Sequence, residues 1–126
     1  MKALASLFVA VALSGCIGVK EGECKAGKNC SCDGIGVCEL ECVGTGCHFE
    51  CSGIGSCEFS CPDGGCTAEA HGQGATELSC AGGDCSLTCD GTGACSLTEC
   101  EENCYVDCEG AGACDNDCSA DTCGVR

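Results

Sequence analysis

Short stretches in which apolar and polar residues alternate recur along residues 32–126, and cysteines or glycine-rich segments bound each of them. In CELEC (38–42), Cys38, Leu40 and Cys42 fall on one side of an extended chain, and the two glutamates fall on the other. A period of two predicts a short β-strand with one buried face. The central positions of these stretches are mostly apolar: Leu40, Phe49, Phe59, Ala68, Leu78, Leu87, Leu97, Val106, Asn116 and Val125.

The alternating stretches belong to five copies of a nineteen-residue repeat: 32–50, 51–69, 70–88, 89–107 and 108–126. Each copy has two predicted strands, one after a five-residue glycine-rich loop and one after a shorter loop. Glycine at sharp corners supplies backbone conformations that other residues avoid. Two strands and two corners per copy predict an all-β fold, a small disulfide-rich β-solenoid with one copy per coil. A string of small disulfide loops without a shared sheet is the alternative.

The predicted solenoid resembles, in architecture only, the small cysteine-stapled β-solenoids found among insect antifreeze proteins. Regular threonine columns would accompany an ice-binding face, and Thr67, Thr88 and Thr98 do not form one. The resemblance therefore concerns the fold and not the function.

The first residues predict an exported protein. A short basic start, MK, precedes the eleven-residue apolar stretch ALASLFVAVAL (3–13), which is too short to span a bilayer but fits a signal peptide. The stretch ends in LSGC (13–16), which resembles the lipobox of bacterial lipoproteins. This resemblance implies that residues 1–15 are a lipoprotein signal peptide, that cleavage precedes Cys16, and that Cys16 is lipidated. Ile17, where aspartate would favour the inner membrane, implies lipid anchoring at the outer membrane of a bacterial cell envelope, on its periplasmic or exposed side.

Composition agrees with an oxidising compartment. The 126 residues include 21 cysteines, 21 glycines, three phenylalanines and no tryptophan. Such a chain has little material for a conventional core and is typical of a disulfide scaffold. We expect residues 16–31 to be a tether after the lipidated cysteine, and residues 32–126 to be the cysteine-rich repeat domain.

Lipidation of Cys16 leaves an even number of cysteines for disulfides. The third copy has Ala70 and Thr76 where the other copies have cysteines on either side of the first loop. Their joint loss favours bridges that close loops within a copy, because partners lost together leave no free thiol. Bridges between stacked cysteines of successive copies remain the alternative. The loop scheme pairs Cys24–Cys30 around a loop of the first type, and then Cys32–Cys38, Cys42–Cys47, Cys51–Cys57, Cys61–Cys66, Cys80–Cys85, Cys89–Cys95, Cys100–Cys104, Cys108–Cys114 and Cys118–Cys123.

Charge separates the two predicted regions. The formal net charge is −15, and residues 32–126 hold eighteen of the twenty acidic residues but a single basic one, Arg126. Such an array repels nucleic acid, so we expect no nucleic-acid partner. Lys20, Lys25 and Lys28 would lie beside the lipid head groups. The expected partners are the membrane, through the lipid on Cys16, and an unidentified protein or surface.

Candidate chemistry is sparse. Stacking places Glu39, Glu58 and Glu77 in one outward column, with Asp115 further along it, which is either a calcium site or a solvated acidic face. His48 and His71 are interpreted as surface residues. One C-x-C and no C-x-x-C give little support for metal binding through thiolates.

No nucleophile–base motif is present, so the prediction is a non-enzymatic protein without a metal or cofactor. The predicted function is that of a lipid-anchored, disulfide-rich cell-envelope protein with a structural, adhesive or protein-binding role. A calcium- or metal-binding surface protein is the alternative.

Overall fold

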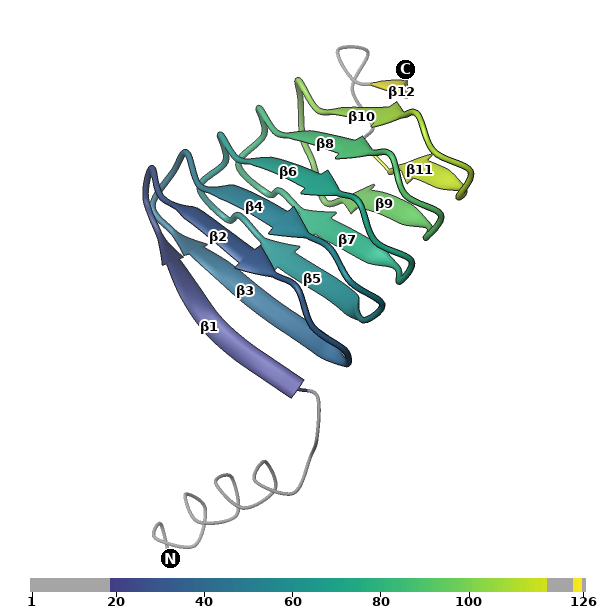
Figure 1. The fold of residues 1–126 in the computed structure, drawn as a ribbon. Helices are drawn as coiled ribbons and strands as arrows, with labels where there is room; N and C mark the ends of the chain where they lie inside the picture. Colours follow the sequence, from purple (N-terminus) through teal and green to yellow (C-terminus); the bar gives the residue numbers. More distant parts are fainter. Residues whose placement is uncertain (1–18, 118–123, 126) are drawn as a thin grey trace, which may run out of the picture.

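The computed structural model describes residues 19–117 and 124–125, which form two parallel β-sheets of six strands each (Figure 1). The odd-strand sheet has the order β1-β3-β5-β7-β9-β11, and the even-strand sheet has the order β12-β10-β8-β6-β4-β2. The strands are β1 (Val19–Lys25), β2 (Asn29–Cys32), β3 (Val37–Val43), β4 (His48–Cys51), β5 (Ser56–Ser60), β6 (Thr67–Ala70), β7 (Thr76–Ser79), β8 (Ser86–Cys89), β9 (Cys95–Thr98), β10 (Tyr105–Cys108), β11 (Cys114–Asn116) and β12 (Gly124–Val125).

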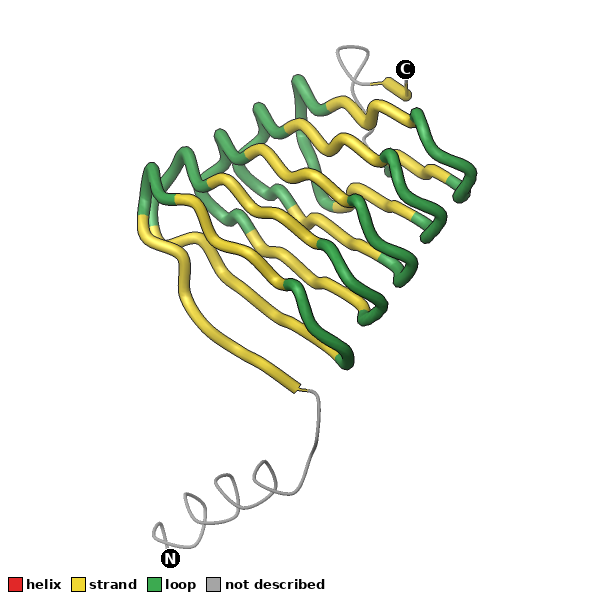
Figure 2. Tube along the Cα trace, viewed as in Figure 1, coloured by secondary structure: helices red, strands yellow, loops and turns green. Residues whose placement is uncertain are grey.

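The chain alternates between the two sheets and advances by one strand per coil. Glu39 lies beside Glu58, and Glu58 beside Glu77, so neighbouring strands are related by the nineteen-residue repeat. The connecting turns line the two edges where the sheets meet (Figure 2). The predicted all-β solenoid with nineteen-residue coils is confirmed.

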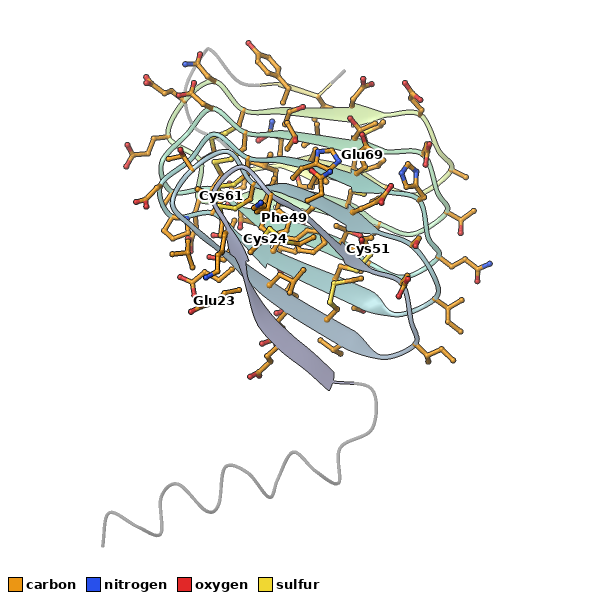
Figure 3. The ribbon with its side chains drawn as sticks, turned by 60° about the vertical axis from the view of Figure 1, so that its left-hand side comes forward. Glu23, Cys24, Phe49, Cys51, Cys61 and Glu69 are labelled. Atoms are coloured by element: carbon orange, nitrogen blue, oxygen red, sulfur yellow. A yellow bond between two sulfur atoms is a disulfide. The ribbon has the colours of Figure 1, made fainter. Side chains whose placement is uncertain are left out.

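The core is the thin layer between the two inward faces. Leu78, Leu87 and Leu97 are fully buried, and buried cysteines lie beside them in the layer, such as Cys85 and Cys89 on either side of Leu87. Phe49 of β4 and Phe59 of β5 stack across the layer with ring centroids 4.5 Å apart. In Figure 3 Phe49 and Cys24 lie between the sheets, whereas Glu23 projects away from them.

Glycine columns allow the loops of successive coils to stack. A Cβ atom at Gly72 would overlap the carbonyl oxygen of Gly53, and one at Gly91 would overlap that of Gly72. The same approach permits a ladder of backbone hydrogen bonds, such as the 3.2 Å bond that the Thr92 amide donates to the Gly72 carbonyl. The hydrogen-bonded ladders of the sheets therefore continue through the stacked loops at the corners.

Residues 19–31 are not a tether, which corrects the predicted boundary. Strand β1 pairs with β3 along its whole length, and β2 pairs with β4, so these residues form an additional first coil. The predicted repeat begins at Cys32 and has a spacing of nineteen residues, which the first coil does not keep throughout. Val19 lies beside Val37, an offset of eighteen, since its turn is one residue shorter.

The signal peptide and Cys16 lie outside the residues that the structure describes. Among those that it does describe, none forms a helix long and apolar enough to cross a membrane.

Candidate functional site

Within residues 19–117, nine disulfides close corners of the solenoid. Each joins cysteines four to six residues apart, as the loop scheme predicts, and none of the described cysteines bonds to its counterpart in the next coil. The bonds are Cys24–Cys30, Cys32–Cys38, Cys42–Cys47, Cys51–Cys57, Cys61–Cys66, Cys80–Cys85, Cys89–Cys95, Cys100–Cys104 and Cys108–Cys114. Cys118 and Cys123 fall outside the described ranges.

The Cys24–Cys30 bridge differs from its predicted placement. Cys24 lies beside Cys42, so the bridge belongs to the second type of corner and not to the first. Its other end, Cys30, lies beside Phe49 and therefore occupies a strand-centre position. In the first coil Lys28 stands at the position of Cys47, so Cys24 bonds instead to Cys30, two residues further along the chain.

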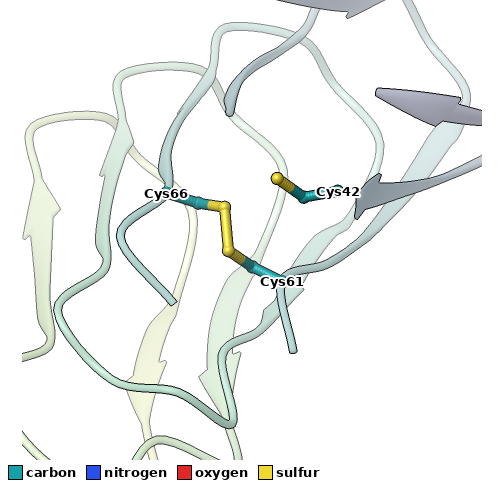
Figure 4. Close-up of side chains that lie close together, drawn as sticks. All are labelled: Cys42, Cys61 and Cys66. Atoms are coloured by element: carbon teal, nitrogen blue, oxygen red, sulfur yellow. A yellow bond between two sulfur atoms is a disulfide. The ribbon is translucent and has the colours of Figure 1, made fainter. Parts of the chain in front are cut away.

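Two groups of three sulfur atoms could be mistaken for metal sites. The Sγ atoms of Cys42, Cys61 and Cys66 lie within 4.8 Å of one another, as do those of a second group, Cys80, Cys100 and Cys104. Figure 4 shows the disulfide between Cys61 and Cys66 with Cys42 beside it. Cys42 is itself bonded to Cys47, which the figure does not draw. Metals bind the thiolate form of cysteine, which a disulfide removes. The proximity follows from stacked bridges.

The predicted acidic column lies on the outer face of the odd-strand sheet. Glu21, Glu39, Glu58 and Glu77 follow one another on adjacent strands, and Asp115 lies beyond Ser96 in the same column. Glu21 was missed because its segment was interpreted as a tether. These four glutamates, with Glu23, Glu41 and nearby residues, line an open groove of about 570 Å³, which we call the acidic groove.

Partial burial of Glu39, together with the neighbouring carboxylates of Glu58 and Glu21, raises the pKa of Glu39. The acidic groove therefore concentrates negative charge, and this charge opposes the ionisation of Glu39. Its carboxylates would attract cations.

A second group of polar side chains lies on the outer face of the even-strand sheet. Glu50 of β4 and Glu69 of β6 are neighbours in register, and His71 begins the loop after β6. The Nε2 atom of His71 lies 3.3 Å from Glu69 Oε1 and 3.7 Å from Glu50 Oε2, whereas its Nδ1 lies 2.6 Å from Asp90 Oδ1. We call Glu50, Glu69, His71 and Asp90 the histidine cluster.

The hydrogen bond to Asp90 is the main reason that the pKa of His71 is raised, although partial burial opposes it. The two predicted surface histidines differ in their surroundings. His48 forms a 2.8 Å hydrogen bond with Thr67 through Nδ1, and its Nε2 lies 3.9 Å from Glu69 Oε2. His71 instead has carboxylates on both ring nitrogens, which the sequence interpretation missed. The repeat period predicts that these residues are neighbours, because His71 and Asp90 are nineteen residues apart, as are Glu50 and Glu69.

No protein-family model, curated protein or solved structure matches this chain.

Proposed function

We propose that the chain is a lipid-anchored, non-enzymatic solenoid of a bacterial cell envelope with a structural, adhesive or protein-binding role. The observation that carries the proposal is the set of nine corner disulfides, which persist in oxidising compartments. The lipobox-like LSGC segment supports the anchor on Cys16. Several acyl chains would hold the protein stably at a membrane.

The corrected fold changes the geometry of the proposed anchoring. Strand β1 begins at Val19, three residues after Cys16. Three residues span at most about 10 Å, so the first coil would stand directly at the membrane surface. Lys25 and Lys28 are exposed on this coil and would lie close to anionic head groups.

The broad polar faces of the two sheets support a binding or structural role. Ladders of side chains repeat on adjacent strands of each sheet, and they include the acidic groove. The proposed partners are the membrane and a protein or surface rather than nucleic acid, because a chain of net charge −15 repels phosphate backbones.

The test is the intact mass of the protein produced in a bacterium with lipoprotein-processing enzymes, before and after reduction. The expected mature chain begins at Cys16, carries acyl mass, and gains two hydrogens per bridge on reduction. In detergent phase separation it should enter the detergent phase, and the Cys16→Ser variant should stay in the aqueous phase. A mature chain with an unmodified Cys16 thiol would contradict the anchor.

Calcium binding is the alternative function, and the acidic groove is the observation that favours it. Six carboxylates line this groove: Glu21, Glu23, Glu39, Glu41, Glu58 and Glu77. A calcium-dependent increase in stability that Glu58→Gln reduces would support this alternative. Equal stability with calcium and with a chelator would contradict it.

A further inference from the structure

The histidine cluster combines one imidazole nitrogen and two carboxylate oxygens around a common point. His71 Nε2, Glu50 and Glu69 each offer a ligand atom, and these atoms all lie within 4.8 Å of one another. All three residues are partly or well exposed, so an ion could reach them directly from solvent.

The separations fit a tetrahedral ion. Metal–ligand bonds of roughly 2.0–2.1 Å at zinc place neighbouring ligand atoms about 3.3 Å apart. His71 Nε2 lies 3.3 Å from Glu69 Oε1 and 3.7 Å from Glu50 Oε2, so small side-chain rotations would complete the geometry. Imidazole with carboxylate is a donor set that suits zinc and its neighbours in the first transition row, whereas calcium prefers six to eight oxygen atoms.

Asp90 sets the tautomer of His71. A carboxylate can only accept here, so Nδ1 of His71 donates the 2.6 Å hydrogen bond to Asp90 Oδ1. Nε2 faces Glu50 and Glu69 and donates the 3.3 Å hydrogen bond to Glu69 Oε1 when the ring is protonated. In the neutral ring, with Nδ1 still bonded to Asp90, Nε2 carries the lone pair, so a bound metal ion would take the place of the Nε2 proton. A carboxylate that fixes the second nitrogen of a histidine in this way is a common companion of bound zinc.

One member of the cluster, His71, lies in the copy that lacks a first-loop disulfide. His71 directly follows Ala70, which with Thr76 replaces the bridge found in the neighbouring copies. Backbone hydrogen bonds still hold the loop, since the His71 amide donates to the Cys51 carbonyl at 2.8 Å and the Asp90 amide donates to the Ala70 carbonyl at 3.0 Å. The backbone of His71 is thus positioned, while its loop is free of the covalent closure that would restrict small adjustments.

We propose that Glu50, Glu69 and His71 bind a divalent transition metal of the zinc class, with Asp90 as a positioning residue and water at the open coordination position. The site does not depend on the proposed anchoring. It also differs from the calcium alternative, which concerns the other sheet.

The test is titration of the oxidised protein with zinc chloride by isothermal calorimetry at physiological ionic strength, where non-specific attraction is screened. Wild-type protein should bind one zinc ion per chain. The H71Q and E69Q variants should each weaken binding at least tenfold. The D90N variant should weaken it about tenfold, in the range seen for companions of metal-bound histidines.

The matched control is Glu77→Gln, which removes the same charge from the acidic groove and should leave zinc affinity within twofold of wild type. Circular dichroism and intact mass establish that each variant is folded and fully bridged. Cobalt substitution adds a second readout, because a tetrahedral cobalt site with an imidazole ligand absorbs visible light. Wild-type affinity in H71Q would overturn the proposal, as would equal weakening by E77Q and E69Q or the lack of a zinc-binding isotherm in wild-type protein.

Discussion

The loops at residues 52–56 and 71–75 occupy equivalent corners of neighbouring coils, but a disulfide closes only the first of them. Their backbones nevertheless form the same ladder. The Ser52 amide donates to the Cys32 carbonyl at 2.8 Å, and the His71 amide donates to the Cys51 carbonyl at the same distance. The path of a corner is therefore set by stacking, and its bridge contributes stability.

Ala70 and Thr76 fill the interior positions of the two missing cysteines but do not replace their disulfide. Ala70 and Thr76 are 5% and 2% exposed, so they point inward as the cysteines do in other coils. Thr76 has a buried hydroxyl oxygen for which the described residues provide no hydrogen-bond partner. An unsatisfied buried polar group costs about 1–3 kcal/mol, which makes this coil the locally weaker one.

The largest expected effect comes from removing every disulfide, which leaves all corners in the state of the unbridged loop 71–75. Reduction should unfold the protein, since each small loop contributes about 2 kcal/mol of stability through its closure and stacking alone must then hold all corners. Far-UV circular dichroism in reductant measures the effect, with the oxidised protein in the same buffer as control. Retention of the β-type spectrum would show that the disulfides are dispensable for the fold.

The next test perturbs stacking while the bridges stay intact. Gly91→Ala should destabilise the protein by up to about 3 kcal/mol, because its Cβ would overlap the Gly72 carbonyl of the unbridged loop. Gly34→Ala is the matched control at the first position of this column, where a Cβ would meet no atom within 4 Å. Urea unfolding compares the two variants, and equal stabilities would contradict a role for close stacking.

Adding the missing bridge should have a similar or smaller effect in the opposite direction. The double change Ala70→Cys with Thr76→Cys should form a further disulfide and stabilise the protein by about 2 kcal/mol. Intact mass after thiol alkylation counts the bridges, and urea unfolding measures the gain. Either change alone should leave one alkylated thiol; a doubly alkylated double variant would show that this corner does not admit a bridge.

The smallest expected effect concerns Glu39, outside the compared loops. Its folded pKa is raised, so the neutral carboxyl is favoured by folding and this contribution is lost as pH rises through the raised pKa. Glu39→Gln, which stays uncharged, should therefore stabilise the protein at pH 7 by less than about 1 kcal/mol and have no effect near pH 3. Asp63→Asn, on a loop away from the acidic groove, is the control in urea unfolding at both pH values; a gain from Glu39→Gln that persists near pH 3 would argue against this cause.

Much of the fold could be predicted because one period governs it. Leu40, Phe59 and Leu78 are buried as the alternation predicts. The ends of the stack deviate. Asn116 at a predicted core position donates hydrogen bonds to the carbonyls of Cys104 and Gly124, and Val125 is 53% exposed. An end coil has fewer neighbours to bury its centre, which a repeat pattern does not express.

The candidate sites depend on side-chain orientation and loop conformation, which the repeat pattern does not specify. Register alone predicts that Glu50 lies beside Glu69 and that His71 lies beside Asp90. It does not predict that the His71 ring turns Nε2 toward both glutamates, because side-chain rotation and loop conformation decide that. The first coil was missed for a related reason, since its eighteen-residue offset conceals that Cys24 stacks on Cys42.

The confinement of each bridge to one corner has a consequence for how such a chain can change length during evolution. Duplication or deletion of a segment such as residues 51–69 adds or removes two whole bridges, Cys51–Cys57 and Cys61–Cys66, and strands no cysteine. The flanking strands would then meet in the register already used between their neighbours. Recombination between repeats can therefore vary the number of coils without disturbing oxidative folding, which bridges between coils would not allow.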